Sequence, residues 1–176
     1  MDPVDQGVIS SQYTVIPRNL IFITHQDSIL LLKGAPDKRL WAHKYNGIGG
    51  HIKPGETPLQ SAHRELLEET GLVVEHLDLR ALIHIRMPKS PGIMLFVFVG
   101  SAENTEVLCS PEGKPEWILK STYQQLELVE DLYKLLPLIL EPGPLIYGSY
   151  ILENTGLAMV FSSGPQQQPD QEVNDV

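Results

Sequence analysis

The stretch from Gly49 to Leu72, GGHIKPGETPLQSAHRELLEETGL, constrains the fold more than any other part of the chain. It carries complete start and stop signals for a helix over residues 58–70. Thr57 suits the N-cap, where it also begins a capping-box pattern, and Pro58 suits the first helical position. Gly71 suits the left-handed position that ends a helix. The stretch therefore predicts a glycine-rich loop followed by a helix.

Three glutamates crowd one side of this helix. At 100° per residue, Leu59, Ala62 and Leu66 share an arc of about 60°, which we interpret as the stripe that faces the core. An adjoining arc of about 100° holds the acidic residues Glu65, Glu68 and Glu69. Like charges at helical spacing repel by roughly 0.2–0.5 kcal/mol per pair. Either solvent offsets this repulsion, as on most charged helix faces, or a bound cation does.

A divalent cation suits the chemistry of this acidic face. Hard cations such as Mg²⁺ prefer carboxylate oxygens, and carboxylates at positions i, i+3 and i+4 would converge on one ion. Arg64 can pair with Glu68 one turn later, and Glu56 is a second candidate partner for Arg64. Four glycines precede the helix, namely Gly47, Gly49, Gly50 and Gly55. Such a loop lets backbone groups approach a ligand closely, or it is an ordinary turn.

Apolar runs separated by turn signals predict strands on both sides of the helix. The predicted strands flank the turn at residues 25–28, lie within 72–87 and 92–100, occupy 115–119, and close the domain as a hairpin over 145–162. Helices are expected at 121–127 and 130–140. Strands and helices interleave without regular βαβ spacing, so the sequence predicts an α+β fold with helices packed on a mixed sheet.

Composition and charge narrow the domain organisation and the partners. We expect a flexible N-terminus over 1–12, one domain over 13–162 and a disordered polar tail over 163–176. A formal net charge of −9 argues against nucleic acid as a partner. The N-terminal residues lack the basic and apolar regions of a signal peptide, and no apolar run reaches membrane-spanning length, so we expect neither feature. Cys109 has no second cysteine to pair with. We expect a cytoplasmic monomer or homodimer that acts on small molecules, without membrane partners.

The complete pattern G-x5-E-x7-R-E-U-x-E-E-x-G-U, in which U is apolar, runs from Gly50 to Leu72. In this pattern the chain resembles the Nudix hydrolases. The matching positions are Gly50, Glu56, Arg64, Glu65, Leu66, Glu68, Glu69, Gly71 and Leu72. The resemblance implies the Nudix fold, a mixed β-sheet sandwiched between α-helices, with this motif as loop, helix and loop.

The resemblance also implies a metal site and a reaction. Mg²⁺, for which Mn²⁺ can substitute, would be held by Glu65, Glu68 and Glu69, often with the carbonyl of Gly50. Arg64 would orient these catalytic carboxylates and form a structural salt bridge with Glu56. The implied reaction is hydrolysis of a nucleoside diphosphate linked to another group. Metal ions neutralise the phosphate charge, and a carboxylate takes the proton from water.

Beyond the motif, the chain is similar to the MutT-type 8-oxo-dGTP diphosphatases of the mammalian branch, over roughly residues 13–162. The segment PEGKPEW implies Glu112 as a further catalytic acid and metal ligand. The segment VEDLYKLLPLIL implies that Glu130 and Asp131 contact the nucleobase. On the residues alone, Glu112 could equally be a surface loop acid, and Glu130 and Asp131 could be acids favoured by a helix N-terminus.

Other expected substrate contacts come from the loop before the helix and from one position at which the chain differs from the mammalian branch. Asn46 would hydrogen-bond the base edge, or serve only as a turn residue, and the backbone of Gly49 would approach the substrate. Where the branch has a tryptophan before the acidic pair, this chain has Leu128, an aliphatic wall without aromatic stacking. We expect Tyr45 and Trp41 to be packing residues.

The leading hypothesis is a Mg²⁺-dependent pyrophosphohydrolase that converts a nucleoside triphosphate, including an oxidised purine nucleotide, to a monophosphate and pyrophosphate. The alternatives are an ADP-ribose or nucleotide-sugar pyrophosphatase, and a non-catalytic Nudix module that senses a nucleotide. Pro88 lies roughly where some ADP-ribose-cleaving relatives carry a proline. A sensing module usually lacks some residues of the motif, whereas this chain retains all of them.

Overall fold

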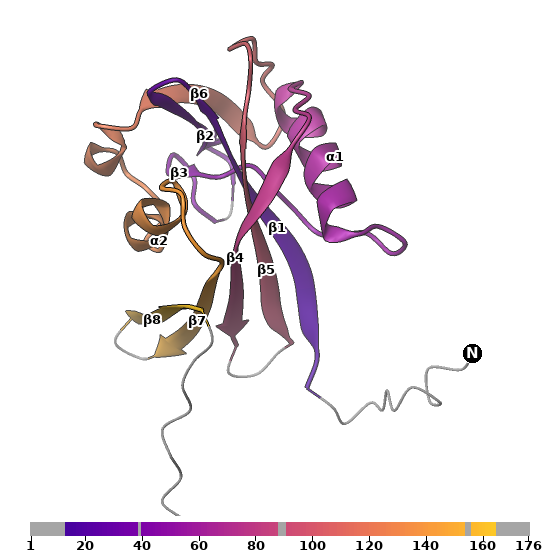
Figure 1. Cartoon of the computed structure of the whole chain (residues 1–176), viewed down its shortest axis with the longest axis vertical. Coiled ribbons are helices and arrows are strands. Elements are labelled where there is room, and N and C mark those ends of the chain that lie inside the picture. Colours follow the sequence, from indigo (N-terminus) through magenta and orange to yellow (C-terminus); the bar gives the residue numbers. More distant parts are fainter. Residues whose placement is uncertain (1–12, 39, 88–90, 154–155, 165–176) are drawn as a thin grey trace, which may run out of the picture.

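The computed structural model describes residues 13–38, 40–87, 91–153 and 156–164. Within them, one eight-stranded sheet lies between two α-helices (Figure 1). The strands are β1 (Val15–His25), β2 (Ser28–Gly34), β3 (Tyr45–Asn46), β4 (Leu77–Arg86), β5 (Gly92–Ser101), β6 (Gly113–Leu119), β7 (Ile146–Glu153) and β8 (Gly156–Ser163). The helices are α1 (Pro58–Thr70) and α2 (Leu132–Ile139). No helix in the described ranges is both long and apolar enough to cross a membrane.

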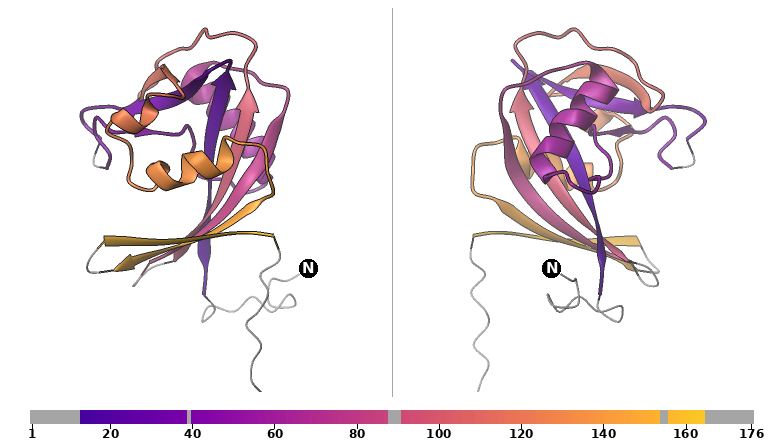
Figure 2. Two further views of the ribbon diagram at one scale, coloured as in Figure 1. Left: turned by 60° about the vertical axis from the view of Figure 1, so that its left-hand side comes forward. Right: turned by 90° about the vertical axis from the view of Figure 1, so that its right-hand side faces the viewer.

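The sheet is mixed, as the sequence predicts. Its strand order is β3-β2-β1-β5-β4-β7-β8, and β6 pairs with β2. β1 runs parallel to β5, and β4 runs parallel to β7, whereas the remaining pairs are antiparallel. The two helices cover opposite faces (Figure 2). The predicted α+β fold, with a mixed sheet between helices, is confirmed.

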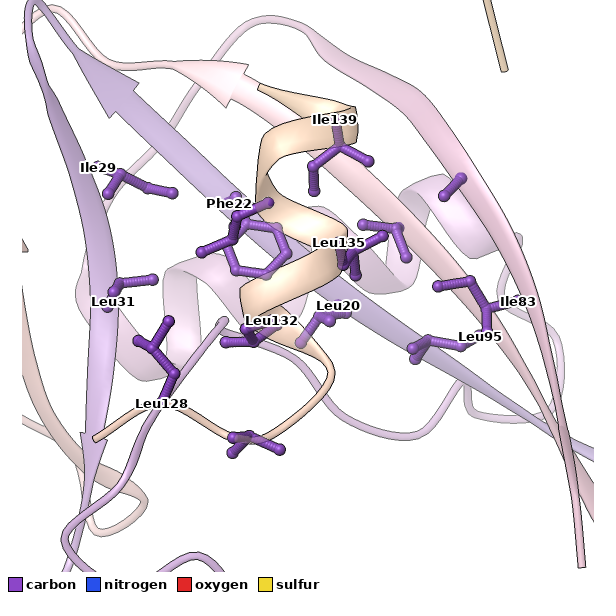
Figure 3. Packing of buried hydrophobic residues seen from close by; sticks show 14 of the residues in the cluster. Leu20, Phe22, Ile29, Leu31, Ile83, Leu95, Leu128, Leu132, Leu135 and Ile139 are labelled. Atoms are coloured by element: carbon purple, nitrogen blue, oxygen red, sulfur yellow. The ribbon is translucent and has the colours of Figure 1, made fainter. Parts of the chain in front are cut away.

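The middle of strand β1, residues 19–23, is buried on both faces, which explains its apolar run LIFI. Leu20 and Phe22 pack toward α2, and Ile21 and Ile23 pack toward α1. Figure 3 shows Phe22 directly beside the apolar side of α2. That side is formed by the fully or almost fully buried residues Leu132, Leu135, Leu136 and Ile139. The sheet therefore separates two cores, and the acidic helix α1 belongs to only one of them.

Helix α1 has the predicted ends. The Thr57 hydroxyl accepts the Gln60 N–H while the Gln60 side chain accepts the Thr57 N–H, and Gly71 ends the helix at φ 74°. The predicted core stripe is wrong at Leu59, which is 43% exposed because the buried side is centred closer to the glutamates. The buried residues are Ser61, Ala62, Leu66, Glu69 and Thr70. One carboxylate, which the pattern placed on the adjoining acidic arc, therefore lies on the buried side of the helix.

The later part of the chain departs from the prediction in its helices. The helix expected at 121–127 is a single 3-10 turn, Tyr123–Gln125, and α2 begins at Leu132. The Tyr133 hydroxyl donates to the Leu126 carbonyl at 2.6 Å, which ties the intervening segment to α2. The closing hairpin is present, and β8 reaches Ser163. The expected flexible N-terminus, most of the expected tail, and Pro88 lie outside the described residues.

Candidate active site

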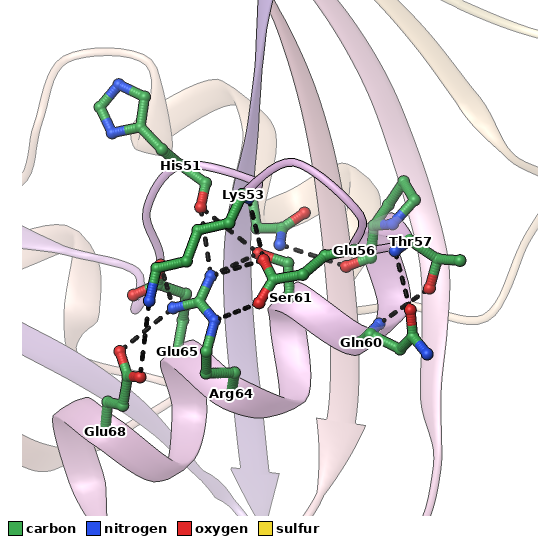
Figure 4. A network of polar contacts seen from close by, with 11 residues as sticks. His51, Lys53, Glu56, Thr57, Gln60, Ser61, Arg64, Glu65 and Glu68 are labelled. Carbon is green, nitrogen blue, oxygen red and sulfur yellow. Dashed lines mark hydrogen bonds and ion pairs between the residues drawn. The ribbon is translucent and has the colours of Figure 1, made fainter.

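Arg64 connects the loop before α1 to the carboxylates on that helix (Figure 4). Its guanidinium donates to both oxygens of Glu56 at 2.5 and 2.8 Å, to Glu65 at 2.8 Å and to Glu68 at 3.1 Å. The ion pairs expected with Glu56 and Glu68 are therefore present. Hydrogen bonds from Arg64, and then one from the Lys53 backbone, lower the pKa of Glu56 to about 2.

The same guanidinium also fastens the loop to the helix. Arg64 donates to the His51 carbonyl at 3.2 Å and to the Ser61 hydroxyl at 3.0 Å. Ser61 is fully buried, and its hydroxyl lies 3.5 Å from the same carbonyl. Since Lys53 N–H also donates to Glu56, at 2.9 Å, the loop is held at several points. This network fixes the backbone that precedes α1 against the acidic face.

Glu69 is the most unusual acid of the site. Its side chain belongs to a residue only 6% exposed, and its Oε2 atom has no partner among the described residues. Burial and then the charge of Glu65 raise the pKa of Glu69 to about 8, and the charge of Glu112 adds to the rise. A backbone hydrogen bond from Gly49 and the charge of Lys38 act in the opposite direction. Glu112 therefore lies within electrostatic reach of Glu69, and its role as a metal ligand stays a prediction.

Two glycines let the loop backbone touch these carboxylates. A Cβ atom on Gly50 would lie 2.5 Å from Glu65 Oε1, so the backbone and the carboxylate are in direct contact. Gly49 has φ 149°, and its backbone group bonds to Glu69. The Gly50 carbonyl, which we expected at the metal, accepts the Asn19 N–H at 2.9 Å. A carbonyl oxygen has a second lone pair, so this bond still leaves it able to act as a ligand.

The three helix glutamates do not meet at one point in this arrangement, and the metal site that they are expected to form stays a prediction. The described residues contain no group of three His, Cys, Asp or Glu side chains already placed to hold a metal ion. Glu65 and Glu68 turn toward Arg64, and Glu112 forms an ion pair with Lys38. The donor types nevertheless fit a divalent cation, because the orphaned Oε2 of buried Glu69 and the nearby carboxylates are oxygen ligands.

The candidates for base recognition lie on two segments that the structure joins. Tyr45 N–H donates to the Glu127 carbonyl at 2.8 Å, and Val129 N–H donates to the Tyr45 carbonyl at 2.9 Å. These bonds bring Asn46 beside the segment that carries Glu130 and Asp131. Asn46 also serves the turn, because its side-chain oxygen accepts the Gly47 N–H at 2.8 Å.

The two acids of that segment differ in environment. Glu130 is exposed, whereas Asp131 is half-buried. Burial raises the pKa of Asp131, and the Tyr150 hydroxyl partly opposes the shift. The burial of Tyr150 itself, and then the charge of Asp131, raise the pKa of Tyr150 well above its usual range. The Asp131 carboxyl therefore has a higher pKa than an exposed aspartate.

Leu128 does not form the open wall of a base pocket. Its side chain is 2% exposed and belongs to the core on the α2 face, so the prediction that it lies over a base is wrong. Tyr45 packs as expected, at 8% exposure, and donates to Glu116 at 2.7 Å. Trp41 was expected to pack, but it is 45% exposed in the loop before β3.

Sequence reasoning missed several residues that support the site. Asn19 contacts both the glycine loop and α1, Ser61 joins the Arg64 network, and Lys38 pairs with Glu112. The available signal for Asn19 is a single polar residue at the start of the apolar run LIFI. Lys38 carries no spacing signal, because chain topology alone brings it to Glu112. Ser61 does carry one, because it lies three residues before Arg64 on the predicted helix.

Comparison with known proteins shows which family and relatives this chain resembles. The model of the NUDIX domain matches residues 16–139. The oxidized purine nucleoside triphosphate hydrolase of Danio rerio is 33% identical over 99 residues, which are 56% of this chain and 62% of that protein. The aligned part thus spans less than two thirds of that relative. The Mus musculus protein of the same name is 30% identical over 123 residues, which are 69% of this chain and 78% of that protein.

A bacterial structure shows the same fold. The crystal structure of the MutT protein from Bacillus halodurans superposes with a TM-score of 0.73 at 24% identity, covering 86% of this chain and all of that one. The family model spans most of the chain and includes the loop, α1 and β6 that carry the site. The chain therefore belongs to the Nudix hydrolase family.

Proposed function

We propose that this protein is a Mg²⁺-dependent pyrophosphohydrolase that cleaves a purine nucleoside triphosphate to a nucleoside monophosphate and pyrophosphate. The observation that carries the proposal is the buried, unpartnered Oε2 of Glu69 beside the Gly49 backbone. A buried acceptor without a partner costs about 1–3 kcal/mol. A divalent cation would satisfy this oxygen and offset the repulsion among the carboxylates, and Mn²⁺ would serve in place of Mg²⁺.

The residues of the site have separate roles in this reaction. Glu65, Glu68, Glu69 and Glu112 would hold the cation. Bound Mg²⁺ supplies positive charge against the phosphate oxygens and acidifies a water molecule. One of these carboxylates accepts a proton as water attacks phosphorus and the bond to the departing pyrophosphate breaks. Arg64 holds the loop and the carboxylates in their relative positions through its ion pair with Glu56.

The purine preference rests on the second half of the site. Asn46, Glu130 and Asp131 lie on two segments joined by backbone hydrogen bonds. An amide beside two carboxyl groups offers both donors and acceptors for hydrogen bonds along a purine edge. Both vertebrate relatives are named for hydrolysis of oxidized purine nucleoside triphosphates, which favours the same class, including oxidised bases, for this chain. We propose a small-molecule substrate and a monomer or homodimer without nucleic-acid partners.

A nucleotide panel tests this proposal. Ordinary and oxidised purine triphosphates, pyrimidine triphosphates, ADP-ribose and a nucleotide sugar are each incubated with Mg²⁺ or with excess EDTA. We expect monophosphate and pyrophosphate from purine triphosphates only when Mg²⁺ is present. Faster cleavage of ADP-ribose or of the nucleotide sugar would assign the alternative pyrophosphatase activity. Binding of a nucleotide without turnover would assign a sensing role.

A further inference from the structure

Asn19 is a buried polar residue in the middle of the sheet, on the same side as the acidic helix. It lies on β1 and is 3% exposed. Its side-chain Nδ2 donates to the Pro58 carbonyl at 3.2 Å, in the first turn of α1. Its backbone N–H donates to the Gly50 carbonyl at 2.9 Å. One residue thus holds the glycine loop with its backbone and the start of α1 with its side chain.

The contact continues from Asn19 to the carboxylate of Glu69. A Cβ atom on Gly49 would lie 2.3 Å from the Asn19 carbonyl oxygen, so the two backbones touch. Gly49 in turn forms the backbone hydrogen bond to Glu69. A shift of Asn19 relative to α1 would therefore change where the Gly49 backbone meets Glu69. Because Glu69 is fixed on α1, the position of the glycine loop relative to α1 determines how the Gly49 backbone meets the Glu69 carboxylate.

The side chain of Asn19 carries a cost in stability, so stability alone does not explain an asparagine at this position. Its Oδ1 atom is buried and has no partner among the described residues. Such an acceptor opposes folding, whereas an apolar residue of similar size would remove the penalty. The neighbouring residues Leu20 and Ile21 show that this strand accommodates large apolar side chains. Retaining an unfavourable polar group suggests a functional reason, since activity and stability often conflict at sites.

We propose that Asn19 is a positioning residue, which sets the Gly49–Gly50 backbone against Glu69 and thereby determines the affinity of the site for a divalent cation. The inference rests on the proposed function, because it assumes that this cluster binds the cation. Asn19 touches neither the cation nor the nucleotide and acts through the loop and the first turn of α1. Groups that orient metal ligands in this way typically contribute about 10- to 100-fold to metal affinity.

The test compares Asn19→Leu with a matched variant on the same strand. Asn19→Leu removes the bond to Pro58 and the orphaned oxygen, but keeps the backbone bond to Gly50. Thr24→Val is the control, because Thr24 donates its hydroxyl to the Gly100 carbonyl at 3.2 Å, away from the glycine loop. Cation binding is measured by titration calorimetry with Mg²⁺ and by electron paramagnetic resonance with Mn²⁺, both without nucleotide. Melting temperatures and steady-state kinetics are measured in parallel.

We expect Asn19→Leu to weaken Mg²⁺ and Mn²⁺ binding about 10-fold and to raise the Mg²⁺ concentration needed for half-maximal rate similarly. Its melting temperature should equal or exceed that of the wild type, and KM for the nucleotide at saturating Mg²⁺ should stay unchanged. Thr24→Val should bind the cations normally. If Asn19→Leu does not fold, Asn19→Ser, which is too short to reach Pro58, carries the same expectation.

Two results would overturn the inference and are distinguishable from each other. Normal cation binding in the Asn19 variant, beside normal binding in the wild type, assigns Asn19 to structure only and leaves the proposed function intact. Absence of cation binding in the wild type removes the proposed function and the inference together. A lowered melting temperature with unchanged cation affinity counts with the first result.

Discussion

At the scale of single residues, Glu69 makes the stability of the cation-free protein depend on pH. Burial and the charge of Glu65 raise its pKa from 4.5 to about 8. Below pH 4.5 the carboxyl is protonated in the folded and in the unfolded chain. Between pH 4.5 and 8 the folded chain holds a proton that the unfolded chain releases, so stability is lost as pH rises through this window.

This dependence gives a prediction for Glu69→Gln. In excess EDTA, the wild-type free energy of unfolding should decrease between pH 5 and pH 8, by up to about 1.4 kcal/mol per pH unit. Glu69→Gln should flatten this decrease, because the amide does not titrate. Urea unfolding at several pH values measures both slopes. Glu75→Gln is the control, since the Glu75 side chain is 88% exposed. Equal slopes in wild type and Glu69→Gln would contradict the assignment.

Glu68 differs from Glu69 because its side chain is 52% exposed, and it pairs with the partly buried Arg64 and the exposed Lys53. Exposed ion pairs contribute about 0–1 kcal/mol, so Glu68→Gln should leave the melting temperature almost unchanged. If Glu68 holds the cation, the same change should lower kcat roughly 100-fold. Melting curves and steady-state rates with Mg²⁺ separate the two effects. A near-normal kcat would remove Glu68 from the catalytic set.

At the scale of elements, the accuracy of prediction depended on whether the signal was local. Helix α1 could be predicted to the residue because Thr57, Pro58 and Gly71 define its ends within its own sequence. The segment 121–127 has helical composition, but its backbone makes i→i+3 bonds, such as Leu126 N–H to the Tyr123 carbonyl, before it turns toward β3. Tertiary contacts with Tyr45 determine the conformation of that segment, and no local sequence pattern predicts those contacts.

A long-range contact at the C-terminal end of helix α2 carries no signal in the sequence. Arg80 of β4 donates to the carbonyls of Ile139, at 3.3 Å, Glu141, at 2.7 Å, and Gly143. These groups lie at and just beyond the C-terminal end of α2, where carbonyls lack helical partners and a positive charge is favourable. Arg80 therefore joins the sheet to the end of the helix that covers it.

We predict that Arg80→Ala lowers the free energy of unfolding by about 1–3 kcal/mol, because three carbonyls lose a charged donor. Urea unfolding measures the change, and Arg86→Ala, at the exposed end of the same strand, is the control. Mg²⁺ affinity should stay unchanged, since Arg80 contacts no residue of α1 or the glycine loop in the described hydrogen bonds. A loss within 0.3 kcal/mol of the Arg86→Ala value would contradict the capping role.

At the scale of the whole molecule, the arrangement of the acidic half of the candidate site was predictable. The arrangement of the half that we propose to bind the base, the base-facing half, was not. Glu56, Arg64 and the helix glutamates lie within one short stretch, so spacing alone relates them. The base-facing half depends on how β3, the segment 126–131 and α2 pack together, and that packing buries Leu128. An aliphatic residue looks the same in a sequence whether it lines a pocket or fills a core.

The burial of Leu128 leads to a prediction that separates the two faces of the sheet. Leu128 belongs to the core on the α2 face, whereas Glu65 and Glu69 lie on α1, across the sheet. Leu128→Trp should overpack this core and destabilise the protein by about 1–3 kcal/mol. Leu128→Ala should leave a cavity and destabilise it by about 2–5 kcal/mol. Both variants should bind Mg²⁺ like the wild type below their melting temperatures, because the sheet between the faces stays intact.

Thermal melts, calorimetric titration with Mg²⁺ and KM for a purine triphosphate provide the measurements, with Val73→Ala, at an 80% exposed position, as control. A lower KM in Leu128→Trp with an unchanged melting temperature would mean that the side chain stacks on a base after all, and that α2 moves aside when the nucleotide binds.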